Sequence, residues 1–127
     1  MSGVAGVRVG RVYDEPGPQD GMRVLADRLW PRGLRRDDPR VGEWRPDVAP
    51  SSELRRWYDH VPERFDEFCR RYEHELAEPT AEAALDELRR VAAVGPLTLV
   101  TASRHLEASH LVVLAALVAD HDTPTEA

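Results

Sequence analysis

Polar and aromatic side chains directly follow one short apolar run of this chain, and their types suit anion binding and proton transfer. In the stretch GMRVLADRLWPRGLRR, residues 21–36, the apolar Val24–Ala26 segment leads into Asp27, Arg28, Leu29, Trp30, Pro31, Arg32 and Gly33. The planar guanidinium group of arginine binds carboxylate and phosphate groups through two parallel hydrogen bonds. A carboxylate such as Asp27 can accept a proton. The stretch therefore predicts a ligand site, although the same residues are compatible with a structural pair of Asp27 with an arginine and with Trp30 as a core residue.

A second polar group follows the apolar segment Leu97–Thr101. The residues Ala102, Ser103, Arg104 and His105 lead from this segment into an expected final helix, a geometry in which backbone amides and the helix dipole favour an anion. The turn contains no glycine-rich phosphate-binding motif. His110 is expected about one and a half turns inside that helix, where it could transfer protons or simply hydrogen bond to a carbonyl group. Ser103 could be a nucleophile, but helix capping is the favoured role.

The two groups meet at one edge of the sheet if both strands are central and parallel, because ligands of open α/β sheets bind at the carboxyl ends of strands. The sequence therefore predicts one site. The candidate catalytic residues are Asp27, His110 and Tyr13, and the candidate ligand-binding residues are Arg28, Arg32, Ser103, Arg104 and Trp30. No metal site and no cofactor are expected, because the histidines lack ligand spacing and Cys69 is the single cysteine.

The expected fold is a single α/β domain over residues 1–127, with three layers, a small and mainly parallel sheet and about four helices on both of its faces. Strands are expected at Val7–Tyr13, at the central stretch around Val24–Leu29 and at Leu97–Thr101, and residues 35–50 should form a long loop. Strand order is left open.

Three helices should connect the second and third strands. Ser51 or Ser52 is expected to cap a short helix, Glu63–Ala77 to form an amphipathic helix, and Thr80 to cap a third helix that ends near Val94. The apolar run Leu111–Ala119 should form a buried final helix, and residues 118–127 should be a frayed tail.

Composition narrows the class of protein. The chain has 17 basic residues, all arginine, and a net charge of −6, so non-specific nucleic-acid binding is not expected. No apolar run approaches the length of a membrane span, and the amino terminus lacks the pattern of a signal peptide, so a cytoplasmic protein without membrane contact is expected. A local basic patch with six arginines lies within residues 28–45.

Two functions of different classes follow from these patterns. The first is an enzyme or binding protein for a small phosphate- or carboxylate-bearing ligand held by Arg28, Arg32 and Arg104. The second is a non-catalytic regulatory or adaptor module that docks an acidic protein or a nucleic acid through the basic 35–45 loop, with Trp44 as an anchor. Whether the protein is an enzyme, and its oligomeric state, are left open.

Three blocks of the chain resemble the YeaO-like branch of domain-of-unknown-function family 488. They are RVYDEPGPQDGMRVLADRLWPRG, WRPDVAPSSELRRWYDHVPERFDEFCRRYEHEL and GPLTLVTASRHLEASHLVVL. The resemblance implies a small bacterial cytoplasmic α/β protein and brings no settled activity. It maps the recurring family residues onto Tyr13, Asp14, Asp27, Arg28, Trp30, Pro31, Arg32, Gly33, Trp44, Pro50, Ser51, Leu54, Arg55, Trp57, Arg104 and His110.

This chain departs from the family pattern at two places. Related sequences often have YAARD where this chain has residues 101–105, TASRH, and often have asparagine where it has Ser109. More distant relatives are similar to this chain but carry cysteines near Thr101 and Ser109. This chain has neither cysteine, so thiol or metal chemistry does not carry over.

Overall fold

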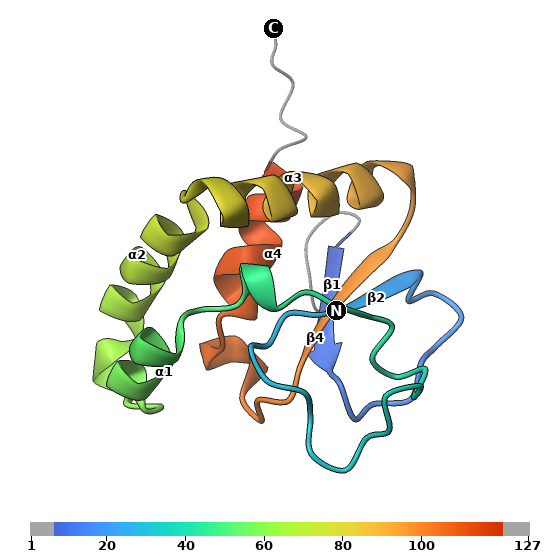
Figure 1. Ribbon diagram of the computed structural model, residues 1–127, viewed down its shortest axis with the longest axis horizontal. Helices are drawn as coiled ribbons and strands as arrows, with labels where there is room; N and C mark the ends of the chain where they lie inside the picture. Colours follow the sequence, from blue (N-terminus) through green and yellow to red (C-terminus); the bar gives the residue numbers. More distant parts are fainter. Residues whose placement is uncertain (1–6, 121–127) are drawn as a thin grey trace, which may run out of the picture.

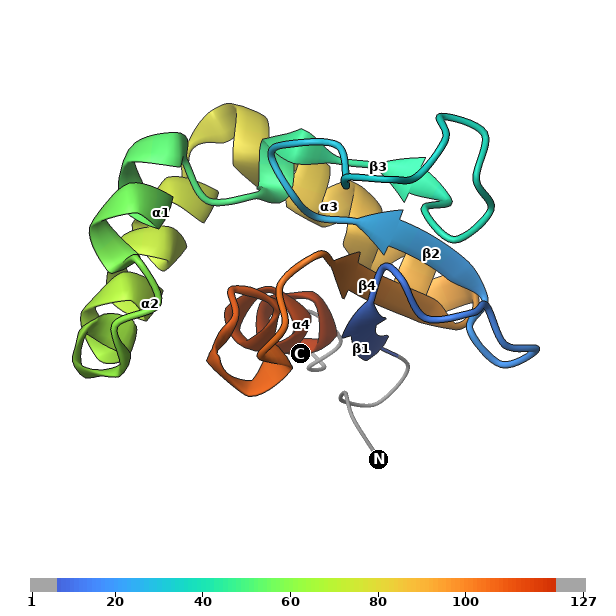
Figure 2. The same ribbon diagram turned by 90° about the horizontal axis from the view of Figure 1, so that it is seen from below.

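Four parallel strands form the centre of the protein in the computed structural model, which describes residues 7–120. The strands are β1 (Val7–Arg11), β2 (Met22–Leu25), β3 (Glu43–Trp44) and β4 (Leu97–Thr101). Their order in the sheet is β1-β4-β2-β3, and every neighbouring pair is parallel (Figure 2). The predicted parallel sheet is therefore confirmed, and all four carboxyl ends lie at one edge.

The helices are α1 (Ser52–Tyr58), α2 (Phe65–Leu76), α3 (Pro79–Val94) and α4 (Leu111–Asp120). The first three connect β3 to β4, and α1 and α2 lie side by side at one end of the molecule (Figure 1). None of the helices within residues 7–120 is long and apolar enough to cross a membrane.

The two faces of the sheet are covered differently. Val7, Val24, Leu97 and Leu99 share one face and pack in the main core with residues of all four helices. Leu25 and Val100 point to the other face, where they pack with Val12, Val41 and Trp44. The layer expected on this second face is therefore made of loops and not of helices, because proline and glycine interrupt the connections that follow β1 and β2.

Several element boundaries differ from the sequence-based expectations. β2 ends at Leu25, and the loop expected over residues 35–50 contains β3 and the 3-10 turn Pro46–Val48. The proposed cap residue Thr80 is not one, because α3 begins at Pro79 and has no side-chain cap. Residues 118–120, expected in the tail, belong to α4, and residues 121–127 lie outside the described residues.

The apolar run Leu111–Ala119 lies in the final helix as predicted, but this helix does not start directly after residues 102–105. The segment after β4 is irregular, passes through the 3-10 turn Leu106–Ala108 and becomes α-helical only at Leu111. His110 therefore precedes α4 instead of lying inside it, and Ser103 and Arg104 lie in a connecting loop. The predicted anion site at a helix start directly after β4 is thus wrong, since no helix starts there.

Candidate functional site

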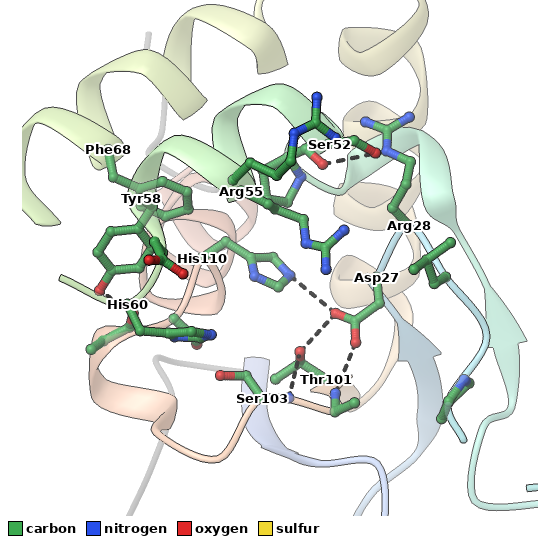
Figure 3. Close-up of a pocket in the computed structure, with 18 of the residues that line it drawn as sticks. Asp27, Arg28, Ser52, Arg55, Tyr58, His60, Phe68, Thr101, Ser103 and His110 are labelled. Carbon is green, nitrogen blue, oxygen red and sulfur yellow. Dashed lines mark hydrogen bonds and ion pairs between the residues drawn. The ribbon is translucent and has the colours of Figure 1, made fainter. Parts of the chain in front are cut away.

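A cavity of about 710 Å³ lies at the carboxyl edge of the sheet. Its floor comes from the segments that leave β2 and β4, and α1 and the following turn form a wall (Figure 3). This is the edge at which parallel sheets bind ligands, because side chains from several strand ends converge there.

Asp27 lies on the floor of the cavity and is held by residues at the end of β4. Its carboxylate accepts hydrogen bonds from the Thr101 hydroxyl at 2.7 Å and from the Ala102 amide at 2.8 Å. Burial is the strongest influence on the pKa of Asp27 and raises it, but the hydrogen bond and charge of His110, together with Ala102 and Thr101, lower the pKa below its ordinary value. Asp27 is therefore an ionised carboxylate at neutral pH.

His110 lies beside Asp27, and its hydrogen bonds define its tautomer. Nε2 lies 2.6 Å from the carbonyl oxygen of Ala26 and 3.4 Å from Oδ1 of Asp27. A carbonyl group only accepts hydrogen bonds, so Nε2 carries a proton and donates it. Nδ1 makes no hydrogen bond within residues 7–120, so it is the nitrogen of His110 that remains able to accept a proton.

Tyr13 and Ser103 also line the cavity. The Tyr13 hydroxyl donates to the carbonyl oxygen of Arg32 at 3.0 Å and so fixes the loop after β2 to the end of β1. The carbonyl oxygen of Ser103 accepts a hydrogen bond from Arg11 at 3.2 Å, which holds the segment after β4 in place. Both residues therefore help to shape the cavity.

The predicted ligand-binding arginines separate into two groups. Arg28 and Arg32 line the cavity, whereas Arg104 is exposed and is not among the lining residues. Arg28 donates to the carbonyl oxygens of Ala49 at 2.7 Å and Pro50 at 3.3 Å, and thereby holds the segment that precedes α1.

Trp30, another predicted binding residue, is half-buried at the cavity wall. Its indole N–H donates to the carbonyl oxygen of Leu34 at 2.8 Å, and its ring packs edge-on against Trp44 at 5.5 Å between centroids. Trp30 therefore supports the loop and offers only part of its surface to the cavity.

The candidate site residues derived from the sequence include none from α1, so its contribution to the cavity was missed. Arg55 and Arg56 line it from α1, and Asp59 and His60 line it from the turn that follows. One signal was available: the helix places Leu54, Trp57 and Tyr58 on its apolar side, which leaves two adjacent arginines on the other side. The resemblance also maps a recurring family residue onto Arg55.

Four arginines line this one cavity: Arg28, Arg32, Arg55 and Arg56. None of them forms an ion pair within residues 7–120, and the carboxylates among the lining residues are Asp27 and Asp59. Arginines elsewhere are paired, such as Arg23 with Asp20 at 2.9 Å and Arg40 with Asp38 at 2.9 Å. The cavity thus carries an excess of positive charge on an acidic protein.

The described residues contain no cluster of side chains that could ligate a metal ion. Within residues 7–120, no group of three or more histidine, cysteine, aspartate or glutamate side chains is placed to hold a metal ion. The chemistry of the cavity is therefore described by its guanidinium, carboxylate, imidazole and aromatic groups.

By its fold and its cavity, this protein is a small all-parallel α/β domain with an arginine-lined pocket at the carboxyl edge of its sheet. Residues 6–126 match the family model described as "Inactive DUF488-N3 subclade", and the chain belongs to this family. The predicted relationship to family 488 is confirmed.

The sequences of three relatives match most of this chain. Uncharacterized proteins of Mycobacterium bovis and Mycobacterium tuberculosis are 57% identical to this chain over 112 residues, which cover 88% of this chain and 92% of theirs. The uncharacterized protein YeaO of Escherichia coli is 37% identical over 105 residues, which cover 83% of this chain and 90% of YeaO. No solved structure gives a significant match.

Proposed function

We propose that this protein binds a small anionic ligand, bearing a phosphate or carboxylate group, in the cavity at the carboxyl edge of the sheet. The observation that carries the proposal is the set of four arginines around one cavity that form no ion pair within residues 7–120. Guanidinium groups that face a common space repel one another, and a bound anion removes that repulsion. Arginine also suits the task because it can hold an oxyanion by two hydrogen bonds at once.

The same geometry favours binding over catalysis. Asp27 is ionised and accepts two hydrogen bonds from its own chain, and His110 donates to a backbone carbonyl group. Both groups are therefore engaged in holding strand ends together. The family description contains the word "Inactive", which agrees with a binding role. Proton-transfer roles for Asp27, His110 and Tyr13 stay predictions, with Nδ1 of His110 as the available base.

The alternative function, docking of an acidic partner by the 35–45 loop, has less support. Arg35, Arg40 and Arg45 form ion pairs with nearby carboxylates, and Arg36 stacks on Trp30 at 4.9 Å. Trp44 is half-buried, and its indole N–H donates to the carbonyl oxygen of Asp27 at 2.8 Å. The charges and the aromatic anchor that this alternative requires are thus already engaged within the protein.

The proposal predicts that inorganic phosphate binds to the full chain and that the double variant Arg55→Gln, Arg56→Gln binds it at least about tenfold more weakly, because hydrogen bonds to charged groups contribute about 1.5–3 kcal/mol each. Glutamine keeps the helical tendency of α1. Isothermal titration calorimetry measures the affinity. Thermal unfolding should change little, because both side chains are exposed and form no ion pair with another residue in 7–120.

The matched control is Arg90→Gln, which removes an exposed arginine that has no ion pair within residues 7–120 and does not line this cavity. It should leave phosphate affinity unchanged. Affinity that is equal in all three proteins contradicts the proposal. An affinity that falls steeply with salt and depends on arginines 35–45 instead favours the docking alternative.

A further inference from the structure

The cavity is much larger than a single oxyanion needs. Its volume of about 710 Å³ lies in the range of roughly 300–1,000 Å³ that is typical of sites for organic molecules. A phosphate group held by the arginines would fill only part of it. A ligand that fills the cavity therefore has an organic body in addition to its charge.

The two sides of the cavity differ in chemistry. Arg28 and Arg55 lie on one side, whereas Tyr58, Phe68 and His60 lie on the other, with the floor between them (Figure 3). Tyr58 and Phe68 are stacked with 4.4 Å between ring centroids and are almost completely buried. This aromatic pair is therefore a rigid wall, fixed further by the hydrogen bond from the Tyr58 hydroxyl to the carbonyl oxygen of Ala108 at 2.9 Å.

His60 adds an exposed ring to the aromatic side of the cavity. Its imidazole lies 5.9 Å from the Tyr58 ring, at an angle of 47° between the two planes. Within residues 7–120, the imidazole makes no hydrogen bond or ion pair. It is therefore available to contact a bound molecule.

The backbone at His60 is in an unfavourable conformation that helix termination does not require. Asp59 has φ 47°, and its amide donates to the carbonyl oxygen of Arg55 at 3.0 Å, which is enough to end α1. His60 follows with φ 57°, a second left-handed residue that is not glycine. Such strain persists where the surrounding structure holds it in place, and it is concentrated at functional sites. Here the left-handed backbone conformation places the imidazole of His60 beside Tyr58 at the cavity.

We propose that the ligand is an aromatic phosphate or carboxylate, whose anionic group binds the arginines and whose planar ring contacts His60 and Tyr58. This inference rests on the proposed anion-binding function. A planar ring gains offset or edge-to-face interactions with these two rings, which a saturated ring of similar size and equal charge lacks. Planarity is therefore the property that the experiment must isolate.

The experiment compares inorganic phosphate, cyclohexyl phosphate and phenyl phosphate by calorimetry with the full chain at about pH 8, where phosphate monoesters are dianions. Phenyl phosphate should bind about threefold to tenfold more tightly than cyclohexyl phosphate, which is the range expected for an aromatic contact. Cyclohexyl phosphate controls for apolar surface and inorganic phosphate for the charge.

The variant His60→Asn tests the residue, because asparagine tolerates a left-handed backbone but has no ring. It should reduce the affinity for phenyl phosphate to that for cyclohexyl phosphate and leave inorganic phosphate unchanged. His74→Asn is the control, since His74 is exposed on α2 and does not line the cavity. Thermal unfolding confirms that each variant is folded.

The possible failures separate the two proposals. Equal affinities for phenyl and cyclohexyl phosphate, or no effect of His60→Asn, overturn the aromatic-ligand inference while phosphate binding stands. Absence of binding by all three compounds, or binding that Arg55→Gln, Arg56→Gln leaves unchanged, overturns the proposed function itself.

Discussion

Asp27 illustrates how one residue can be both part of a site and part of the structure around it. It follows β2, and its carboxylate accepts hydrogen bonds from the Thr101 hydroxyl and the Ala102 amide at the end of β4. It therefore links two neighbouring strands at the edge where the cavity opens. The carboxylate is a constant negative charge that limits how much anionic charge the arginines can hold.

The variant Asp27→Asn should lower the free energy of unfolding by about 1–3 kcal/mol at neutral pH, because a hydrogen bond to a charged acceptor is lost or weakened. The loss should depend on pH. Because folding lowers the pKa of Asp27, its contribution is fully present above the unfolded value of about 4 and is lost as the pH falls through the folded value.

Urea unfolding between about pH 7 and pH 3 measures this effect, since the difference in stability between the wild type and the variant should narrow towards the acidic end. A constant difference over the whole range would show that Asp27 does not contribute through its charge. A variant as stable as the wild type at neutral pH would show that the hydrogen bonds of the Asp27 carboxylate contribute no net stability.

At the scale of the element, α1 connects stability with the proposed binding site. Ser51 caps the helix by accepting a hydrogen bond from the Leu54 amide at 3.1 Å. Its own hydroxyl and amide donate to Glu75 of α2, at 2.6 and 2.8 Å. The helix that carries Arg55 and Arg56 is thereby fixed to its neighbour at its first turn.

The variant Ser51→Ala should therefore cost about 1 kcal/mol or more of stability, the usual loss for a helix cap, and should also weaken phosphate binding because α1 is less firmly placed. Chemical unfolding and calorimetry measure the two effects. Thr80→Ala is the matched control, since α3 has no side-chain cap. If both variants lose the same stability, the cap and its contact with Glu75 do not matter.

At the scale of the whole molecule, the loop layer on the second face of the sheet has to lie close to the strands. Gly42, with φ 69°, precedes β3, and a Cβ atom there would lie 2.2 Å from the carbonyl oxygen of Arg23 in β2. Gly33 also has a positive φ, 83°, but a Cβ atom there would meet nothing within 4 Å. The two glycines thus have the same conformational requirement and different surroundings.

Gly42→Ala should therefore destabilise the protein by several kcal/mol, since it adds a backbone collision to the strain, whereas Gly33→Ala should cost only about 1–2 kcal/mol for the left-handed backbone. Thermal or urea unfolding of both variants provides the comparison. Equal losses would mean that the loop moves away from β2 without cost and that the close approach is not needed.

Local patterns in the sequence were sufficient to predict many of the strands and helices of this fold. The apolar runs around Val24 and at Leu97–Thr101 predicted buried parallel strands, and the apolar spacing predicted helices close to α1, α2 and α3. The apolar run Leu111–Ala119 predicted the body of α4, but the helix was expected to start directly after residues 102–105, because the sequence did not show that the irregular segment at 102–110 is held by contacts such as that of His110 with the carbonyl oxygen of Ala26. Boundaries of this kind depend on tertiary packing.

The sequence by itself determined that polar residues after β2 and β4 would meet, because the carboxyl ends of parallel strands share one edge. Only the tertiary structure decided which arginines face the same cavity. Arg104 follows β4 directly but lies outside it, whereas Arg55 and Arg56 enter it from a helix far along the chain. The physical reason is that hydrophobic periodicity specifies which face of a helix is buried, while the position of that helix over the sheet depends on long-range contacts such as Ser51 with Glu75.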